Sequence, residues 1–211
     1  SCNGWNPTDI FVRTYDKKKE FTKSFAFRMK TDSEKKLTRN TGFYERTSKL
    51  TRNFVDARGF WLPNDYTKHG VINEYTACRE KAVVIDLSSL RKFEILGPDA
   101  EELMNYTLTR NIKKLSVGQI VYSAMCYENG TMFDDGTLLR LSETGFRWVC
   151  GDEYAGEWLK EQAKKKNLKV IIKNSTDQIN NISVQGPNSR KILEKIIFTP
   201  PTQPTISELQ W

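Results

Sequence analysis

Two stretches of the chain repeat one local pattern: FEILGPDAEELM at residues 93–104 and ISVQGPNSRKIL at residues 182–193. Each begins as a strand, passes through Gly-Pro and an Asp or Asn, and continues with the apolar spacing of an amphipathic helix. Glycine permits the tight corner, proline ends the strand ladder, and the Asx side chain can cap the helix. Two copies so far apart predict a pseudo-duplicated strand–Gly-Pro–helix unit, and hence an α+β fold.

The segment between the two copies predicts a sheet with helices beside it. A run rich in β-branched, aromatic and sulfur-containing residues precedes Asn129-Gly130, which predicts a two-residue hairpin turn. The continuous apolar run at residues 82–87 predicts a buried strand. The other expected strands are 119–128, 131–141, 145–150 and 168–173, and the expected helices are 71–81 and 154–163. The fold class is therefore α+β, with mixed or antiparallel sheets and helices.

The composition predicts a folded chain whose first part differs from the rest. Of 211 residues, 38% are hydrophobic and 11% aromatic, which supports a core and excludes wholesale disorder. Residues 1–40 are rich in Lys and Thr and have only short apolar runs. We interpret them as an N-terminal extension ahead of one main domain at residues 41–211.

The net charge of +7 favours an anionic partner such as nucleic acid, a phosphate or a polyanionic cofactor. The longest Lys runs, at residues 17–19 and 164–166, lie far apart and lack interleaved aromatic residues. This distribution is typical of a solvated surface. No helix-turn-helix, RNP-like or zinc pattern occurs, so a nucleic-acid partner is not expected. No apolar run is long enough to span a bilayer, so no membrane partner is expected.

Cysteine and histidine usage argues against a metal centre. The four cysteines, Cys2, Cys78, Cys126 and Cys150, have neither metal-ligand nor redox spacing, and this usage suits a reducing compartment such as the cytoplasm. The sole histidine, His69, excludes a zinc site built on several histidines. Because it lies in a polar, turn-rich stretch, we expect a loop residue rather than a catalytic one.

Two carboxylates, Asp134 and Asp135, stand side by side in the strand expected after the hairpin. Adjacent strand residues point to opposite faces of a sheet. These carboxylates therefore serve different roles, and strand alternation alone does not say which of them faces a site.

Together these segments resemble the folate-binding domain of the aminomethyltransferase family. That family includes the T-protein of the glycine cleavage system and the tetrahydrofolate-binding portions of sarcosine and dimethylglycine oxidases and dehydrogenases. The resemblance is carried by residues 55–63, 85–90, 97–100, 108–112, 118–125, 129–135 and 184–187. No single motif is strong, but their order and spacing make the resemblance specific over residues 41–211.

The resemblance implies a role for each carboxylate. Asp135 resembles the family aspartate that faces tetrahydrofolate and the amine donor. A carboxylate there can orient a reacting amine and stabilise the positive charge that develops as a one-carbon unit leaves nitrogen. Asp134 points to the other face, where we expect a hydrogen bond or ion pair that holds the turn.

Four further residues are implied as cofactor-binding. Tyr122 resembles a family tyrosine whose ring packs on the cofactor. Leu90, Trp148 and Cys150 fall where the family lines its pocket. The alternative for each of the four is ordinary core packing.

The chain departs from T-proteins at three places. Ser89-Leu90 stands where many members carry His-Met, Cys150 where many carry Asn, and Gly136 where Leu is common. These departures leave the amine donor open. Family members also continue with an Arg-x-Gly-Tyr-Thr-Gly-Glu type segment and a C-terminal barrel, and neither occurs before Trp211. We therefore expect a C-terminally truncated domain, either a fragment or a subunit that a companion chain completes.

The resemblance implies an enzyme that transfers a one-carbon unit from a small-molecule amine donor to tetrahydrofolate, as an aminomethyltransferase or an N-demethylase. The alternative is a non-catalytic folate-binding or scaffold subunit that needs a companion chain. A basic nucleic-acid module is a third hypothesis, which only the net charge favours.

Overall fold

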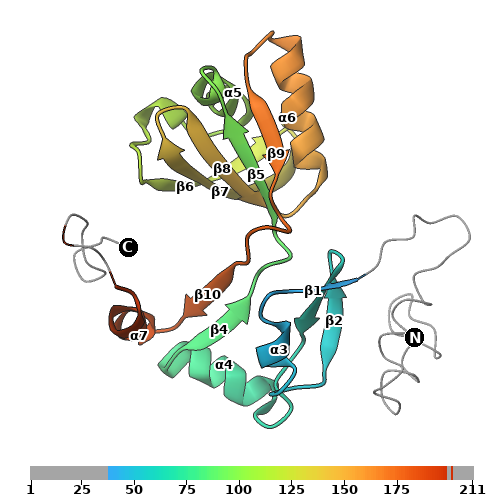
Figure 1. Cartoon of the computed structure of the whole chain (residues 1–211), viewed down its shortest axis with the longest axis vertical. Helices are drawn as coiled ribbons and strands as arrows, with labels where there is room; N and C mark the ends of the chain where they lie inside the picture. Colours follow the sequence, from blue (N-terminus) through green and yellow to red (C-terminus); the bar gives the residue numbers. More distant parts are fainter. Residues whose placement is uncertain (1–37, 199–200, 202–211) are drawn as a thin grey trace, which may run out of the picture. The chain divides into compact units, whose positions relative to one another are not determined.

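The computed structural model describes residues 38–198 and residue 201 (Figure 1). Most of the predicted extension, residues 1–37, lies outside the described residues. The described chain divides into two compact units. Unit 2 is Leu90–Asn181, and unit 1 comprises the described residues up to Ser89 and from Ile182 onward. Each unit combines sheet and helix, so the predicted α+β class is confirmed.

Unit 2 is built on a five-stranded antiparallel sheet with the strand order β6-β7-β8-β5-β9 (Figure 1). Its elements are β5 (Arg91–Leu96), α5 (Ala100–Thr107), η1 (Ile112–Lys114), β6 (Ile120–Cys126), β7 (Met132–Ser142), β8 (Gly145–Cys150), α6 (Tyr154–Lys165) and β9 (Ile171–Asn174). The strands and helices predicted for this part of the chain are all present. Their bounds differ by a few residues, most clearly at β9, which begins at Ile171.

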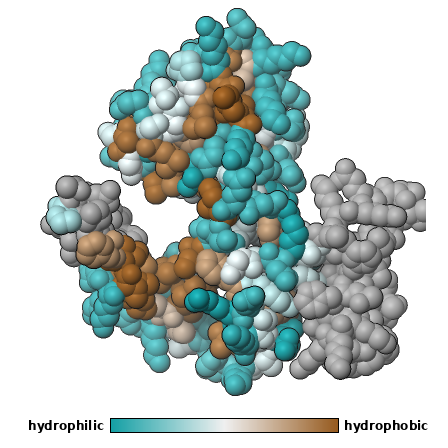
Figure 2. Space-filling view, viewed as in Figure 1, coloured by the Kyte–Doolittle hydropathy of each residue, from teal (hydrophilic) through white to brown (hydrophobic). Residues whose placement is uncertain are grey.

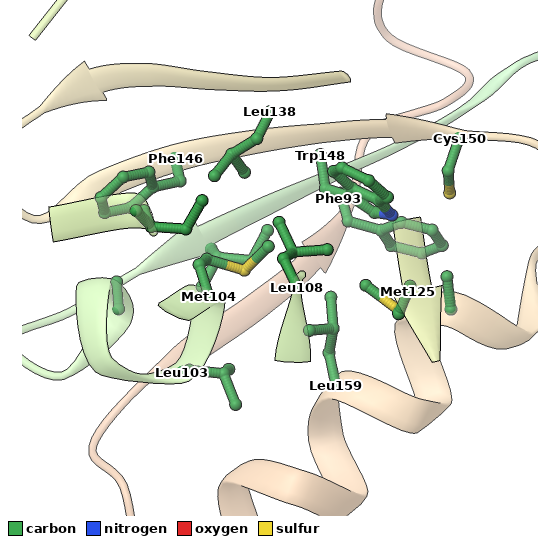
Figure 3. Packing of buried hydrophobic residues seen from close by; sticks show 14 of the residues in the cluster. Phe93, Leu103, Met104, Leu108, Met125, Leu138, Phe146, Trp148, Cys150 and Leu159 are labelled. Atoms are coloured by element: carbon green, nitrogen blue, oxygen red, sulfur yellow. The ribbon is translucent and has the colours of Figure 1, made fainter. Parts of the chain in front are cut away.

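Helices α5 and α6 lie against one face of this sheet and close the core of unit 2. Figure 3 shows side chains from the sheet and from both helices meeting in that core. Leu138 of β7, Trp148 of β8, Leu103 of α5 and Leu159 of α6 are all 0% exposed. Because strand residues alternate, the face that carries Leu138 and Trp148 is the covered face, and the next residue along each strand points the other way.

Unit 1 contains two smaller sheets and three helices. The first sheet has the order β1-β3-β2, with β1 parallel to β3 and β2 antiparallel to it, and the second is the antiparallel pair β4–β10. The elements are β1 (Arg39–Asn40), α3 (Tyr44–Thr47), β2 (Phe54–Ala57), β3 (Phe60–Pro63), α4 (Gly70–Glu80), β4 (Val83–Asp86), β10 (Ile182–Gln185) and α7 (Ser189–Ile196). The predicted mixture of parallel and antiparallel pairing is therefore present.

The pseudo-duplicated strand–Gly-Pro–helix unit is confirmed. Gly97 and Gly186 have positive φ angles of 135° and 125°, and each leads into an eight-residue helix, α5 or α7. A Cβ atom would lie 2.5 Å from a backbone oxygen at Gly97 and 2.6 Å from one at Gly186, so both corners require glycine. The predicted side-chain caps are wrong, because neither Asp99 nor Asn188 caps its helix. The Asp99 carboxylate instead accepts the backbone N–H of Lys169 at 2.6 Å.

The predicted two-residue turn at the β6–β7 hairpin is wrong in length. The Gly130 N–H donates to the Tyr127 carbonyl at 2.9 Å, and the Tyr127 N–H donates to the Thr131 carbonyl at 2.9 Å. The loop therefore has three residues, the last of which is Gly130 with φ 85°. A two-residue type I′ turn needs positive φ at Asn129 as well, and Asn129 does not have it.

The strand predicted at residues 82–87 forms as β4, but it is not buried. Val84 is 57% exposed and Ile85 is 43% exposed. Its side chains stay exposed because β4 belongs to a two-stranded sheet and pairs only with β10 among the described residues. The adjacent helix α4 has no buried residue either.

Candidate functional site

Strand β7 separates the two adjacent carboxylates as predicted. Asp134 is 8% exposed and pairs in register with the buried residue Met125 of β6. Asp135 is exposed and pairs with Ala124. The carboxylates therefore lie on opposite faces of the five-stranded sheet, with Asp134 on the core face and Asp135 on the open face.

Asp134 holds the connection between β8 and α6. Its Oδ1 atom accepts the backbone N–H of Asp135 at 2.9 Å and that of Gly151 at 3.3 Å, and its Oδ2 atom accepts the N–H of Asp152 at 3.1 Å. The predicted hydrogen-bonding role of Asp134 is thus confirmed. The bonded segment is the β8–α6 connection, however, and not the hairpin turn.

Asp135 shares the open face with Tyr122 of β6. Tyr122 pairs with Thr137, two residues beyond Asp135, so Tyr122 and Asp135 are diagonal neighbours on one face. The Tyr122 side chain is 61% exposed. Ala124 and Thr137 complete this part of the face, and their short side chains leave the carboxylate and the phenol ring prominent. The predicted catalytic residue and one predicted cofactor-binding residue therefore lie side by side.

A second carboxylate on the open face is neutralised, in contrast to Asp135. Glu94 of β5 accepts hydrogen bonds from the Arg147 guanidinium at 2.7 Å and from the Ser175 hydroxyl at 2.9 Å. Over residues 38–198 the Asp135 carboxylate has no ion pair or side-chain hydrogen bond. Asp135 is therefore an exposed carboxylate that remains available to an external cation or N–H donor.

The sequence analysis did not single out Arg110, which lies beside Tyr122. Thr109 continues the sheet edge, because its N–H donates to the Ala124 carbonyl at 3.1 Å. Arg110 follows, and its Nε–H donates to the Tyr122 carbonyl at 3.3 Å while its side chain stays exposed. Its position could have identified it from the sequence, because Arg110 is a cationic residue within residues 108–112, one of the segments that carry the family resemblance.

Trp148 and Cys150 lie on the opposite face from Asp135 and Tyr122. Trp148 is 0% exposed and Cys150 is 2% exposed, and both belong to the core (Figure 3). Burial and the nearby Asp134 carboxylate raise the pKa of the Cys150 thiol far above its ordinary value, so this thiol is not a nucleophile near neutral pH. The structure does not bring these two residues together with the open face, and their burial favours the alternative of core packing.

Gly136 explains how the Trp148 ring is accommodated. A Cβ atom on Gly136 would lie 2.9 Å from Cζ2 of Trp148 and 3.1 Å from Cβ of Cys150. Two of the three departures from T-proteins, Gly136 and Cys150, are therefore neighbours on the core face. These two residues therefore affect side-chain packing in the core of unit 2, and they do not contribute side chains to the open face.

Leu90 lies two strands from Asp135 in the sheet. It is half-buried and directly precedes β5, which is separated from β7 by β8 in the sheet order. Its carbonyl accepts a hydrogen bond from the Lys92 ammonium at 2.8 Å. Lys92 is 1% exposed, so this bond satisfies a buried cation.

Within residues 38–198 and residue 201, no cluster of three or more His, Cys, Asp or Glu residues is arranged to hold a metal ion. In that same part of the chain, no helix combines the length and the apolar character that a membrane span requires.

The GCVT N-terminal domain family matches residues 43–203, which is most of the chain. The chain belongs to this family.

Three similar proteins illustrate the range of that family. The trimethylamine-oxide aldolase of Ruegeria pomeroyi is 54% identical over 211 residues, which is 100% of this chain and 27% of that protein. The aminomethyltransferase of Symbiobacterium thermophilum is 34% identical over 164 residues, 75% of this chain and 43% of the relative. The crystal structure of the glycine cleavage system aminomethyltransferase T from Bartonella henselae matches with a TM-score of 0.64 and 26% identity, over 75% of this chain and 43% of that chain. The chain thus spans less than half the length of these relatives.

Proposed function

We propose that this chain forms part of a tetrahydrofolate-dependent one-carbon transfer enzyme, and that Asp135 is its catalytic carboxylate. The observation that carries the proposal is the exposed Asp135 carboxylate, unpaired among the described residues, beside the exposed Tyr122 ring. Glu94, the carboxylate of β5 on the same face, is neutralised by Arg147, whereas Asp135 has no such partner in the described chain, so Asp135 is the carboxylate that we expect an incoming amine to meet. The family membership supports the same assignment.

The residues of the open face suit the chemistry of this proposal. Tetrahydrofolate, when bound, supplies the amine nitrogens that accept the one-carbon unit. Tyr122 offers an exposed ring against which a flat heteroaromatic ring can pack. Arg110, at the same sheet edge, offers a cation to the carboxylates of such a ligand. Trp148 and Cys150 do not suit contact with it, since both are buried on the other face.

Asp135 would act on the donor amine in two ways. Its carboxylate accepts a hydrogen bond from a donor N–H and so orients the carbon–nitrogen bond that breaks. As that bond breaks, positive charge develops on the one-carbon fragment and its nitrogen, and the carboxylate stabilises this charge electrostatically. Exclusion of water by a covering polypeptide or a bound ligand would strengthen the interaction.

The comparisons favour a methylated amine, or its oxide, as the source of the one-carbon unit. Identity is 54% to a trimethylamine-oxide aldolase over the whole chain, and 34% to an aminomethyltransferase over 75% of it. We therefore propose demethylation of a methylated amine N-oxide, in which the N–O bond breaks, its oxygen leaves as water, and the methyl carbon reaches the formaldehyde level as an iminium that the tetrahydrofolate nitrogens take up with release of the demethylated amine, rather than transfer of an aminomethyl group derived from glycine. The free thiols of Cys78, Cys126 and Cys150 suit a reducing compartment, and we propose the cytoplasm.

The alternative is a non-catalytic folate-binding or scaffold subunit. It is favoured by one observation, that the chain spans only 27% and 43% of the two relatives compared above. In this alternative a companion polypeptide supplies the groups that complete the pocket.

The test is one-carbon transfer by the full-length protein that contains this chain, measured with an isotope-labelled methylated amine N-oxide and tetrahydrofolate. Asp135→Asn should lower turnover by about 100-fold or more, because the neutral amide no longer stabilises developing positive charge. Tetrahydrofolate affinity, measured by calorimetry, should change by no more than about threefold, because the proposed role of Asp135 is to stabilise the transition state and not to bind the cofactor in the ground state. Glu128→Gln is the matched control, because Glu128 is an exposed carboxylate near the same hairpin that pairs instead with Lys165.

Each outcome separates the hypotheses. Unchanged turnover in Asp135→Asn contradicts the catalytic assignment. Tetrahydrofolate binding without any turnover in the unaltered protein supports the scaffold alternative. Binding that appears only after a companion polypeptide is added supports a divided enzyme.

A further inference from the structure

A cavity of about 630 Å³ lies in unit 1, between the end of α3 and the loop that joins β3 to α4. Volumes of about 300 to 1,000 Å³ are typical of small-molecule sites. Its described lining includes three cations, Lys49, Arg52 and Lys68, and one carboxylate, Glu45. This lining therefore has a net charge of +2, from three positive charges and one negative charge. We call this cavity the α3 cavity.

The three cations of the α3 cavity are exposed and have no counter-ion in the described part of the chain. Over residues 38–198 none of them forms an ion pair or a side-chain hydrogen bond, whereas Lys165 of α6 pairs with Glu128 at 2.9 Å. Figure 2 shows mainly hydrophilic side chains over the region of α3, in contrast to the apolar side chains over β10 and α7. A cavity lined by charges of one sign concentrates the electrostatic field and attracts an ion of the opposite sign.

Hydrogen bonds join the two walls of the α3 cavity. The Asn64 N–H donates to the Asn53 carbonyl at 2.8 Å, and the Asn53 amide donates to the Asp65 carboxylate. The hydroxyls of Thr51 and Thr67, which both line the cavity, are 3.4 Å apart. Thr51 is 4% exposed, so this contact fixes a buried residue of one wall to the other wall. The backbone that carries the cations is therefore preorganised, which lowers the entropic cost of binding.

The lining of the α3 cavity suits phosphate groups that are attached to a flat or apolar group. A guanidinium offers a fork of N–H donors to two phosphate oxygens, and an ammonium adds a point charge. The hydroxyls of Ser48 and Thr67 can donate further hydrogen bonds. Leu50, which is 60% exposed, and the Tyr44 ring supply apolar surface in the same cavity.

We propose that the α3 cavity binds a phosphorylated small molecule, whose phosphate groups contact Lys49, Arg52 and Lys68 and whose flat or apolar group lies against Leu50. A nucleoside diphosphate has this composition. A nucleic-acid backbone is less suited, because it follows an extended row of cations, whereas these three line one cavity. The cavity belongs to unit 1 and Asp135 to unit 2, and the proposal does not rest on the one-carbon chemistry proposed above.

The test is isothermal titration calorimetry of the full-length protein that contains this chain. The probes are ADP, inorganic pyrophosphate, citrate and a single-stranded oligonucleotide, in about 50 mM NaCl, where charge screening is weak. We expect ADP and pyrophosphate to bind. Citrate should bind at least about fivefold more weakly than ADP, because a terminal phosphate offers three acceptor oxygens and a carboxylate offers two.

Variants at exposed positions assign the binding to the α3 cavity. Arg52→Gln should lower ADP affinity by about tenfold or more, because it removes the guanidinium fork, and Lys49→Gln and Lys68→Gln by about threefold or more. Leu50→Ser should lower ADP affinity by about threefold or more and leave pyrophosphate affinity unchanged, since pyrophosphate has no apolar group. Lys173→Gln is the matched control, because Lys173 is an exposed lysine of β9 in unit 2, and it should change either affinity by less than about twofold.

Four results would overturn the proposal. The first is that neither ADP nor pyrophosphate binds. The second is that Arg52→Gln and Lys173→Gln weaken binding equally, which would show that net charge alone attracts the anion. The third is that citrate or the oligonucleotide binds more tightly than ADP, which would identify a polycarboxylate or a nucleic acid as the ligand. The fourth is that Leu50→Ser leaves ADP affinity unchanged, which would remove the apolar contact from the site.

Discussion

The two strand–Gly-Pro–helix joints have the same local geometry and opposite burial. Gly97 and Gly186 adopt similar positive φ angles, and each is followed by a helix of eight residues. Helix α5 buries Ala100, Leu103, Met104 and Thr107, whereas α7 buries no residue. Local sequence therefore determines the shape of the joint but not its burial.

The difference lies in the sheet to which each joint belongs. Strand β5 is flanked on both sides, by β8 and β9, in a five-stranded sheet. In the described part of the chain, strand β10 pairs with one strand, β4. A helix is buried when it packs on the face of a sheet that is wide enough to cover it. Within the described residues, the five-stranded sheet of unit 2 is wide enough for α5, and the two-stranded β4–β10 sheet does not cover α7.

The largest effect should come from the core of unit 2. Trp148→Ala should lower the free energy of unfolding by about 3–5 kcal/mol, because the ring is fully buried and leaves a cavity. Ile196→Ala on α7 should change it by no more than about 0.5 kcal/mol, since that side chain is already exposed. Urea titration followed by circular dichroism measures both. Equal losses would refute the contrast between the two joints.

Trp148→Phe refines the same comparison. The Trp148 indole N–H has no hydrogen-bond acceptor among the described residues, so removing it forfeits no bond there. The phenylalanine variant should therefore lose clearly less stability than the alanine variant in the same urea titration. A loss as large as that of Trp148→Ala would mean that the indole nitrogen is bonded after all.

Substitution of the corner glycines tests whether both joints are equally constrained. Gly97→Ala and Gly186→Ala should each cost roughly 1–3 kcal/mol more than Gly118→Ala. All three glycines have positive φ, but an added Cβ meets a backbone oxygen within 2.6 Å at the first two and no atom within 4 Å at Gly118. Thermal unfolding of the three variants gives the comparison. Three similar costs would show that backbone strain, and not the close contact, dominates.

Substitution of Asp134 and of Asp135 should change the free energy of unfolding by different amounts, although each substitution removes one negative charge. Asp134→Asn should cost about 1–3 kcal/mol, because its carboxylate accepts three backbone N–H groups in a buried position. Asp135→Asn should change stability by less than about 0.5 kcal/mol, because its exposed side chain makes no ion pair or hydrogen bond in the described chain. Denaturant midpoints of the two variants decide the point. A larger loss for Asp135→Asn would reverse the assignment of the two faces.

The three cysteines of the described chain should react with a thiol reagent at different rates, and this test requires no substitution. Cys150 is 2% exposed and burial raises the pKa of its thiol, so iodoacetamide should leave it unmodified in the folded protein at pH 8. Cys78 and Cys126 are half-buried and should react first. Mass spectrometry of peptides after timed labelling distinguishes them. Early modification of Cys150 would show that the core of unit 2 opens readily.

The sequence by itself determined the features that depend on short-range spacing. Alternation in one strand separated Asp134 from Asp135, and the Gly-Pro corners predicted two strand–helix joints with restricted geometry. The strands and helices between the joints were predicted as well. These features follow from side-chain periodicity and backbone sterics over a few residues, which are properties of the local sequence.

Only the tertiary structure decided which residues share a face and which are covered. Spacing showed that Trp148 and Cys150 share a face of β8, but the register of β7 with β8 places that face opposite Asp135. The register of β6 with β7 brought Tyr122 and Asp135 together. The apolar strand β4 was expected to be buried, yet it has only one neighbouring strand among residues 38–198. Register and burial depend on contacts between distant segments, and periodicity within one segment carries no information about its neighbours.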